Sequence, residues 1–198
     1  MTRKRTAPRR TIKLTDPRAL RAVAHPIRLE LIGLLRRSGP LTATRASELI
    51  GESAASCSFH LRQLAKYGLV EEAGGGRGRE RPWRATAMFT EWPEIGGAPE
   101  TDAASELLST VVAERYFENV MGWLERRRHE PAEWREAAMF GDTILYLTPA
   151  ELGDVARRIR ELAEPYVRRT ADAERRPEGS RAVSLLHLAF PLAEERER

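Results

Sequence analysis

The side chains with the clearest chemical purpose lie in residues 53–66 and in a glycine-rich loop that follows. One side of a helix expected at 53–66 carries small, hydroxylic, aromatic or basic side chains and no carboxylate: Ala55, Ser56, Ser58, Phe59, Arg62 and Lys66. Such groups can approach base edges, bind phosphates or touch a thymine methyl. The loop adds Arg77, Arg79 and Arg81, which suit a phosphate backbone or a minor groove. These residues predict a DNA-binding surface in the first hundred residues.

Other kinds of site find little support in the sequence. Cys57 is the only cysteine, so the chain can form no internal disulfide, which fits a reducing compartment. The four histidines are far apart, with no pairing at helical spacing, so we expect no metal site. No glycine loop opens a helix and no nucleophile elbow is present, so we expect neither a cofactor nor an enzyme.

Two residues of the expected helix at 53–66 have alternative roles. His60 precedes an apolar core position, so it is either a half-buried histidine that is hydrogen-bonded within the domain or a phosphate contact. Cys57 lies on the apolar stripe of this helix, which favours a buried hydrophobic side chain over a redox sensor. The loop arginines have an alternative as well, an ordinary solvated turn.

Charge divides the chain into two unequal halves. The 198 residues carry a net charge of +4, but residues 1–99 hold 18 Lys and Arg against 9 Asp and Glu, whereas the remainder is acidic. Any nucleic-acid surface should therefore lie in the first half, although the excess of arginine could also reflect a GC-rich genome. No apolar stretch is long enough to span a membrane, and no apolar segment follows the basic N-terminus, so we expect a cytoplasmic protein.

The first half has the pattern of four short helices and a hairpin. Each helix has a start signal, because a capping residue or a proline precedes its apolar residues. The starts fall at Asp16, His25, Thr42 and Ser53. Gly39, Gly51 and Gly68 stand near helix ends. Residues 69–73 and 83–86 then predict two strands joined by the basic glycine-rich loop. A helix-turn-helix followed by a hairpin is a winged helix.

Three sequence blocks carry a family resemblance. LRAVAHPIRLELI at residues 20–32, SCSFHLRQLAKYGLV at 56–70 and GRERPW at 78–83 together resemble the winged-helix domain of ArsR-type bacterial transcriptional regulators, over residues 16–86. The resemblance implies a DNA-binding regulator. Sensors of that family commonly hold metal or arsenic through cysteine pairs before the recognition helix or through Asp, His and Glu on a C-terminal helix. Residues 42–50 contain no cysteine or histidine, so metal sensing is not implied here.

The second half predicts two amphipathic helices, 102–128 and 149–169, with strands at 143–147 and 182–190. The longer helix has a wide apolar stripe, part of which we expect at a homodimer interface: Leu107, Leu108, Val111 and Tyr116. Aromatic side chains in this half could line a pocket for a small apolar effector, or fill the domain core instead: Tyr116, Trp123, Trp134, Phe140 and Tyr146.

The sequence as a whole predicts a mainly α fold with small β (α+β). Its expected parts are a flexible basic arm at 1–13, a winged helix at 14–88, a linker at 89–100, a dimerisation domain at 101–192 and a charged tail at 193–198. The function expected is that of a homodimeric regulator that binds double-stranded DNA, acting as a repressor. The alternative is a winged-helix module that binds protein and does not read DNA.

Overall fold

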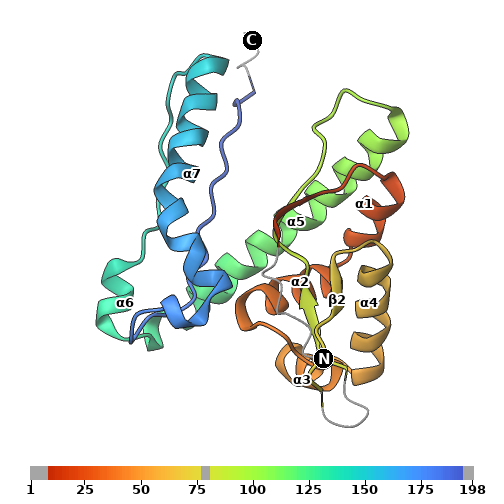
Figure 1. Cartoon of the computed structure of the whole chain (residues 1–198). Coiled ribbons are helices and arrows are strands. Elements are labelled where there is room, and N and C mark those ends of the chain that lie inside the picture. The colour runs from red at the N-terminus through yellow and green to blue at the C-terminus, as the bar shows by residue number, and fades with distance from the viewer. Residues whose placement is uncertain (1–8, 77–80, 194–198) are drawn as a thin grey trace. The chain divides into compact units, whose positions relative to one another are not determined.

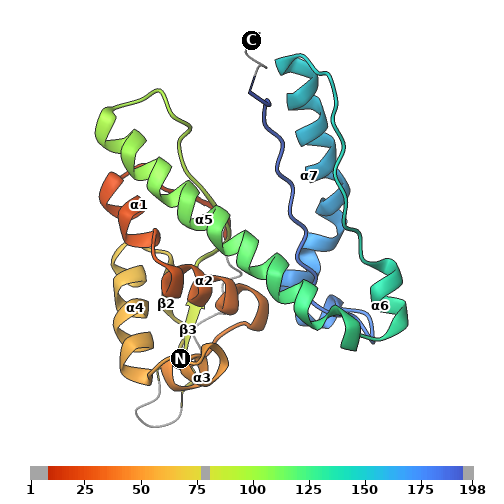
Figure 2. The same cartoon turned by 180° about the vertical axis from the view of Figure 1, so that it is seen from behind.

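The computed structural model describes residues 9–76 and 81–193. Its elements are mainly helices with a few short strands, which confirms the fold class predicted from the sequence. Contacts group the chain into two units, residues 1–122 and 123–198 (Figures 1 and 2). Among the described residues, no helix is long and apolar enough to cross a bilayer.

Four short helices open the first unit, and their boundaries follow the predicted caps. They are α1 (Pro17–Val23), α2 (Pro26–Ser38), α3 (Ala43–Ile50) and α4 (Ala54–Lys66). Asp16, Thr42 and Ser53 each accept a hydrogen bond from a backbone N–H in the first turn of the helix that follows. Gly51 ends α3 with φ +75°, a left-handed conformation that glycine adopts without strain.

The strands form two small ladders. β2 (Val70–Glu72) pairs antiparallel with β3 (Trp83–Ala85), as the predicted hairpin requires. Leu41, just before α3, exchanges two backbone hydrogen bonds with Trp83, at 3.0 and 2.8 Å. β1 (Arg9–Lys13) pairs in parallel with β4 (Ala87–Glu91). Residues 9–13 are therefore a strand, unlike the flexible arm expected for 1–13, and residues 1–8 lie outside the described range.

The core of the first unit extends into α5 (Pro99–Arg126). Leu20 of α1, Leu31 of α2 and two leucines of α4, Leu61 and Leu64, are completely buried. Ala104 and Leu108 of α5 are equally buried and belong to the same apolar cluster. The first turns of α5 are thus part of the N-terminal unit, and β4 occupies residues expected to form the linker at 89–100.

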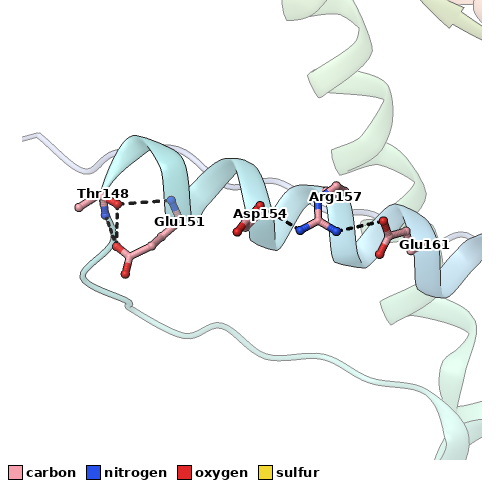
Figure 3. A network of polar contacts seen from close by, with 5 residues as sticks. All are labelled: Thr148, Glu151, Asp154, Arg157 and Glu161. Carbon is pink, nitrogen blue, oxygen red and sulfur yellow. Dashed lines mark hydrogen bonds and ion pairs between the residues drawn. The ribbon is translucent and has the colours of Figure 1, made fainter.

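The second unit contains a short 3-10 turn (Arg127–His129), α6 (Ala132–Ala137), α7 (Pro149–Ala171) and a final 3-10 turn (Ala173–Arg175). The predicted capping box at the start of α7 is present: Thr148 Oγ1 accepts from the Glu151 backbone N–H, and the Glu151 carboxylate accepts from the Thr148 backbone N–H at 2.8 Å (Figure 3). Both hydrogen bonds of Thr148 to that carboxylate lower the pKa of Glu151.

The strands predicted in the second unit are wrong. Residues 143–147 and 182–190 are extended but make no ladder. In both views α7 lies between the two segments, which keeps their backbones apart (Figures 1 and 2). The apolar composition of these segments correctly indicated an extended backbone. A strand also needs a neighbouring backbone to pair with, and no described residue pairs with either segment.

Candidate nucleic-acid interface

The helix pair α3 and α4 has helix-turn-helix geometry. Only Gly51, Glu52 and Ser53 separate the two helices, and the left-handed Gly51 ends α3 and begins the turn between them. α4 lies at the outer edge of the first unit in both views (Figures 1 and 2). A helix held in this way can enter the DNA major groove with one face free.

The inner face of α4 is locked into the core. Cys57, Leu61 and Leu64 are completely buried at the spacing of one helical face. Burial raises the pKa of the Cys57 thiol, and the nearby carboxylates Glu52 and Glu30 raise it further. A buried thiol with a raised pKa is a poor nucleophile, so the structure supports the core role of Cys57 over that of a redox sensor.

The outer face of α4 carries the residues predicted to contact DNA. Ala55, Phe59, Arg62 and Lys66 are exposed, and Phe59 has 52% of its surface accessible. Ser56 and Ser58 are half-buried beside them. No residue of α4 is acidic. The structure thus brings all six predicted residues onto one helix, with the largest and the basic ones open to solvent.

His60 is buried and contacts another histidine. Only 8% of its surface is accessible, and its ring centroid lies 4.6 Å from that of His25, at the start of α2. Neither His25 Nδ1 nor His60 Nδ1 has a hydrogen-bond partner among the described residues. Burial lowers the pKa of both histidines, and the Arg28 charge lowers it further. His60 is therefore a buried side chain that packs against His25 and not an exposed phosphate ligand.

The hairpin partly balances its own charge. The Glu71 carboxylate of β2 forms an ion pair with the Arg84 guanidinium of β3 at 2.7 Å. The Glu72 carboxylate lies 3.9 Å from the Arg81 guanidinium. Arg81 remains exposed and can turn toward a phosphate, because its partner is at the limit of an ion pair. Arg77 and Arg79, the other predicted hairpin contacts, lie outside the described residues.

Two arginines that sequence reasoning missed lie within this scaffold, and one of them joins two of its elements. Arg36 of α2 donates from Nε to the Ala87 carbonyl at 3.0 Å and from a terminal nitrogen to Thr90 Oγ1 at 2.7 Å, which ties β4 to α2. Its burial lowers the pKa of the guanidinium to about 10. Arg115 of α5 lies so close to Gly33 of α2 that an added Cβ would be 3.0 Å from its guanidinium. Both residues look like ordinary surface arginines in the sequence.

The residues predicted for a dimer interface on α5 separate into two groups. Leu108 is completely buried in the core of its own chain, so it is not available to a partner. Leu107 is 46% exposed, and Val111 and Tyr116 are half-buried. The correction has a simple cause: helical periodicity shows which residues share a face, but it does not show what covers that face.

The predicted effector residues are not gathered into a pocket by the second unit. Phe140 and Tyr146 are 72% and 98% exposed. Trp134 is half-buried and stacks under Arg181, with 5.0 Å from the guanidinium to the ring centroid. Trp123 is half-buried next to Arg126, and Tyr116 belongs to the first unit.

Comparison with known proteins agrees with this geometry. A family model described as a helix-turn-helix domain matches residues 23–73, from the end of α1 through β2. A search of curated proteins returned no match to the chain. Within the described residues, no three His, Cys, Asp or Glu side chains form a group that could hold a metal ion. The chain carries a helix-turn-helix domain, the class of domain through which non-enzymatic regulators bind DNA.

Proposed function

We propose that this protein is a cytoplasmic transcriptional regulator of ArsR-like type that binds a specific double-stranded DNA site as a homodimer. It acts as a repressor and uses no metal ion. The observation that carries the proposal is the outer face of α4, which is exposed, free of carboxylates and basic at Arg62 and Lys66. A module that binds acidic protein partners is the second candidate, because the same basic face would suit it.

Different residues of the α4 face are suited to base edges and to phosphates. Ala55 and Ser56, in the first turn, are small enough for close approach to the groove, and Ser58 can exchange a hydrogen bond with a base edge. Phe59 can contact a thymine methyl, and Arg62 can bind a guanine edge. Lys66, at the C-terminal end of α4, and Arg81, on the hairpin, are proposed to contact phosphates. Arg77 and Arg79 are proposed to follow the backbone or enter the minor groove.

The first experiment replaces Arg62 and measures binding to two duplexes. One duplex is selected by the protein from a random pool, and the other has a scrambled sequence. Arg62→Ala should weaken binding to the selected duplex by about 1–3 kcal/mol and reduce the preference between the two, because a bidentate contact to guanine is lost. Arg158→Ala, an exposed arginine on α7, removes the same charge far along the chain and should leave the preference unchanged.

Two results would contradict the proposal. Equal affinity of the wild-type protein for both duplexes at physiological salt would argue against a sequence-specific regulator. Failure to bind either duplex, with retained binding to an acidic polypeptide, would favour the protein-interaction candidate.

The remaining parts of the function concern the second half of the chain. We propose that residues beyond the winged helix hold the dimer, with Leu107, Val111 and Tyr116 of α5 contributing where they are still accessible. Two-fold DNA sites require recognition helices about 34–36 Å apart, which a dimer interface outside the winged helix can set. A small apolar effector, bound near Trp123, Trp134, Phe140 and Tyr146 once the dimer forms, would alter that spacing.

A further inference from the structure

The second unit has apolar side chains but no core. Every described side chain of residues 123–193 is at least partly exposed, whereas the first unit buries an extended apolar cluster. The apolar residues left open include Ile144, Leu145 and Tyr146 in one extended segment and Leu185, Leu188 and Phe190 in the other. A unit of this size needs a buried apolar centre to stay folded, so these side chains call for a covering surface that the unit itself does not supply.

The backbones of the same two segments are also open. Residues 139–147 and 181–193 make no backbone–backbone hydrogen bond with any residue of the described chain. Both are extended and rich in apolar residues, and α7 lies between them (Figures 1 and 2). An exposed extended segment with apolar side chains is a template for pairing with another strand.

The polar side of α7 needs no partner. Arg157 donates to Asp154 at 3.0 Å and to Glu161 at 3.1 Å, which forms a continuous charged ridge along the helix (Figure 3). The apolar side starts half-buried at Val155 and Ile159 but becomes exposed at Leu162 and Tyr166. α7 is therefore suited to cover a sheet with its apolar side while its charged ridge faces water.

The occupant that fits best is a second copy of this chain. Residues 182–193 contain no Asp, Glu, Lys or Arg, and residues 138–147 contain only Asp142, so like charges do not oppose self-pairing and no charged partner is selected. Thirteen large apolar side chains of the unit are exposed. At about 100 Å² for each fully exposed side chain, they offer on the order of 800 Å², which is what each partner buries in a standard interface.

We propose that two copies of this chain dimerise by pairing residues 143–147 and 182–190 with the same segments of the partner, which forms a shared sheet covered by the two α7 helices. The sheet is completed only when both copies contribute strands. The inference rests on the proposed function only in that a two-fold DNA site calls for a dimer; its structural basis is the missing core. Such an interface is isologous, so one pair of segments satisfies both copies.

Amide hydrogen exchange of the full-length protein, combined with its mass from light scattering, tests the proposal in the absence of DNA. A dimer with amides of 143–147 and 182–190 slowed by more than about tenfold, and with that protection lost on dilution to monomer, is expected. A monomer with protected segments would overturn the proposal, since the sheet would then lie within one chain. A dimer whose segments exchange freely would also overturn it.

A variant pair adds a second test. Leu188→Asp places a charge within the shared sheet and should shift the protein to monomer, with far-UV circular dichroism confirming that the helices remain. Ala150→Asp adds the same charge at the first turn of α7, where an acid is favourable, and should leave the dimer intact. A dimeric Leu188→Asp protein would count against the shared sheet. DNA affinity is measured separately, so a strand-paired dimer that reads no DNA would refute the proposed function alone.

Discussion

At the scale of single residues, the rings of His25 and His60 bring α4 into contact with the start of α2. Their rings are in contact, both Nδ1 atoms lack a described partner, and the charged groups that influence them are Arg28 and Glu52. Burial is the main cause of the lowered pKa of each ring, and Glu52 opposes it only in part. The folded protein therefore prefers both histidines neutral.

This pair predicts a loss of stability in mild acid. Because the folded pKa of each histidine lies below 6.5, the unfolded chain binds more protons in acid, and the free energy of unfolding falls as the pH drops below about 6.5. The stabilising contribution is complete above that pH. Urea unfolding of the wild type at pH 7.5 and 5.5 measures the loss, which His60→Asn should reduce. A His60→Asn protein that loses as much stability as the wild type between these two pH values would contradict the prediction.

At the scale of elements, local signals predicted the first unit well. Caps at Asp16, Thr42 and Ser53 and the glycine after α3 fixed four helix boundaries, because each acts through hydrogen bonds to immediate neighbours. The exposed face of α4 was predicted from helical periodicity. Contacts between distant residues were out of reach: the pairing of β1 with β4, the burial of Leu108 and the anchoring by Arg36 all depend on tertiary structure.

α5 contributes to the core of the N-terminal unit, although the sequence predicted a linker, residues 89–100, between that unit and this helix. Leu108→Ala should destabilise the protein by about 2–5 kcal/mol, because a completely buried leucine leaves a cavity. Phe117→Ala removes more atoms from the same helix, but from a side chain that is 69% exposed, and should cost only about 0.5 kcal/mol. Chemical denaturation followed by circular dichroism compares them. Equal effects would show that α5 does not complete the N-terminal core.

At the scale of the whole molecule, the uneven charge matters most. The first half is basic and the second acidic, and exposed Arg62 and Lys66 lie in the basic half. A long-range field of this kind orients the chain toward a polyanion before any specific contact forms. The acidic half is repelled by the same polyanion, which favours approach through the winged helix.

DNA binding should therefore weaken steeply with salt. Each phosphate neutralised by an arginine or lysine releases counterions, and the log–log slope is about −0.9 for each contact in duplex DNA. Lys66→Ala should reduce the magnitude of the slope by about one, with little change in sequence preference. Titrations at several salt concentrations measure both quantities. A slope near zero would mean that phosphates are not the main source of affinity.

The burial of Cys57 makes its thiol a natural probe of local opening around α4. The thiol is the only one in the sequence, it is completely enclosed, and it lies on the inner face of α4. A thiol reagent can reach it only when the packing of α4 on the core opens, so the labelling rate reports how often this opening occurs. A duplex bound to α4 should slow this labelling. The ratio of the labelling rates without and with DNA measures how much DNA binding stabilises the packing of α4 on the core, and it needs no added probe.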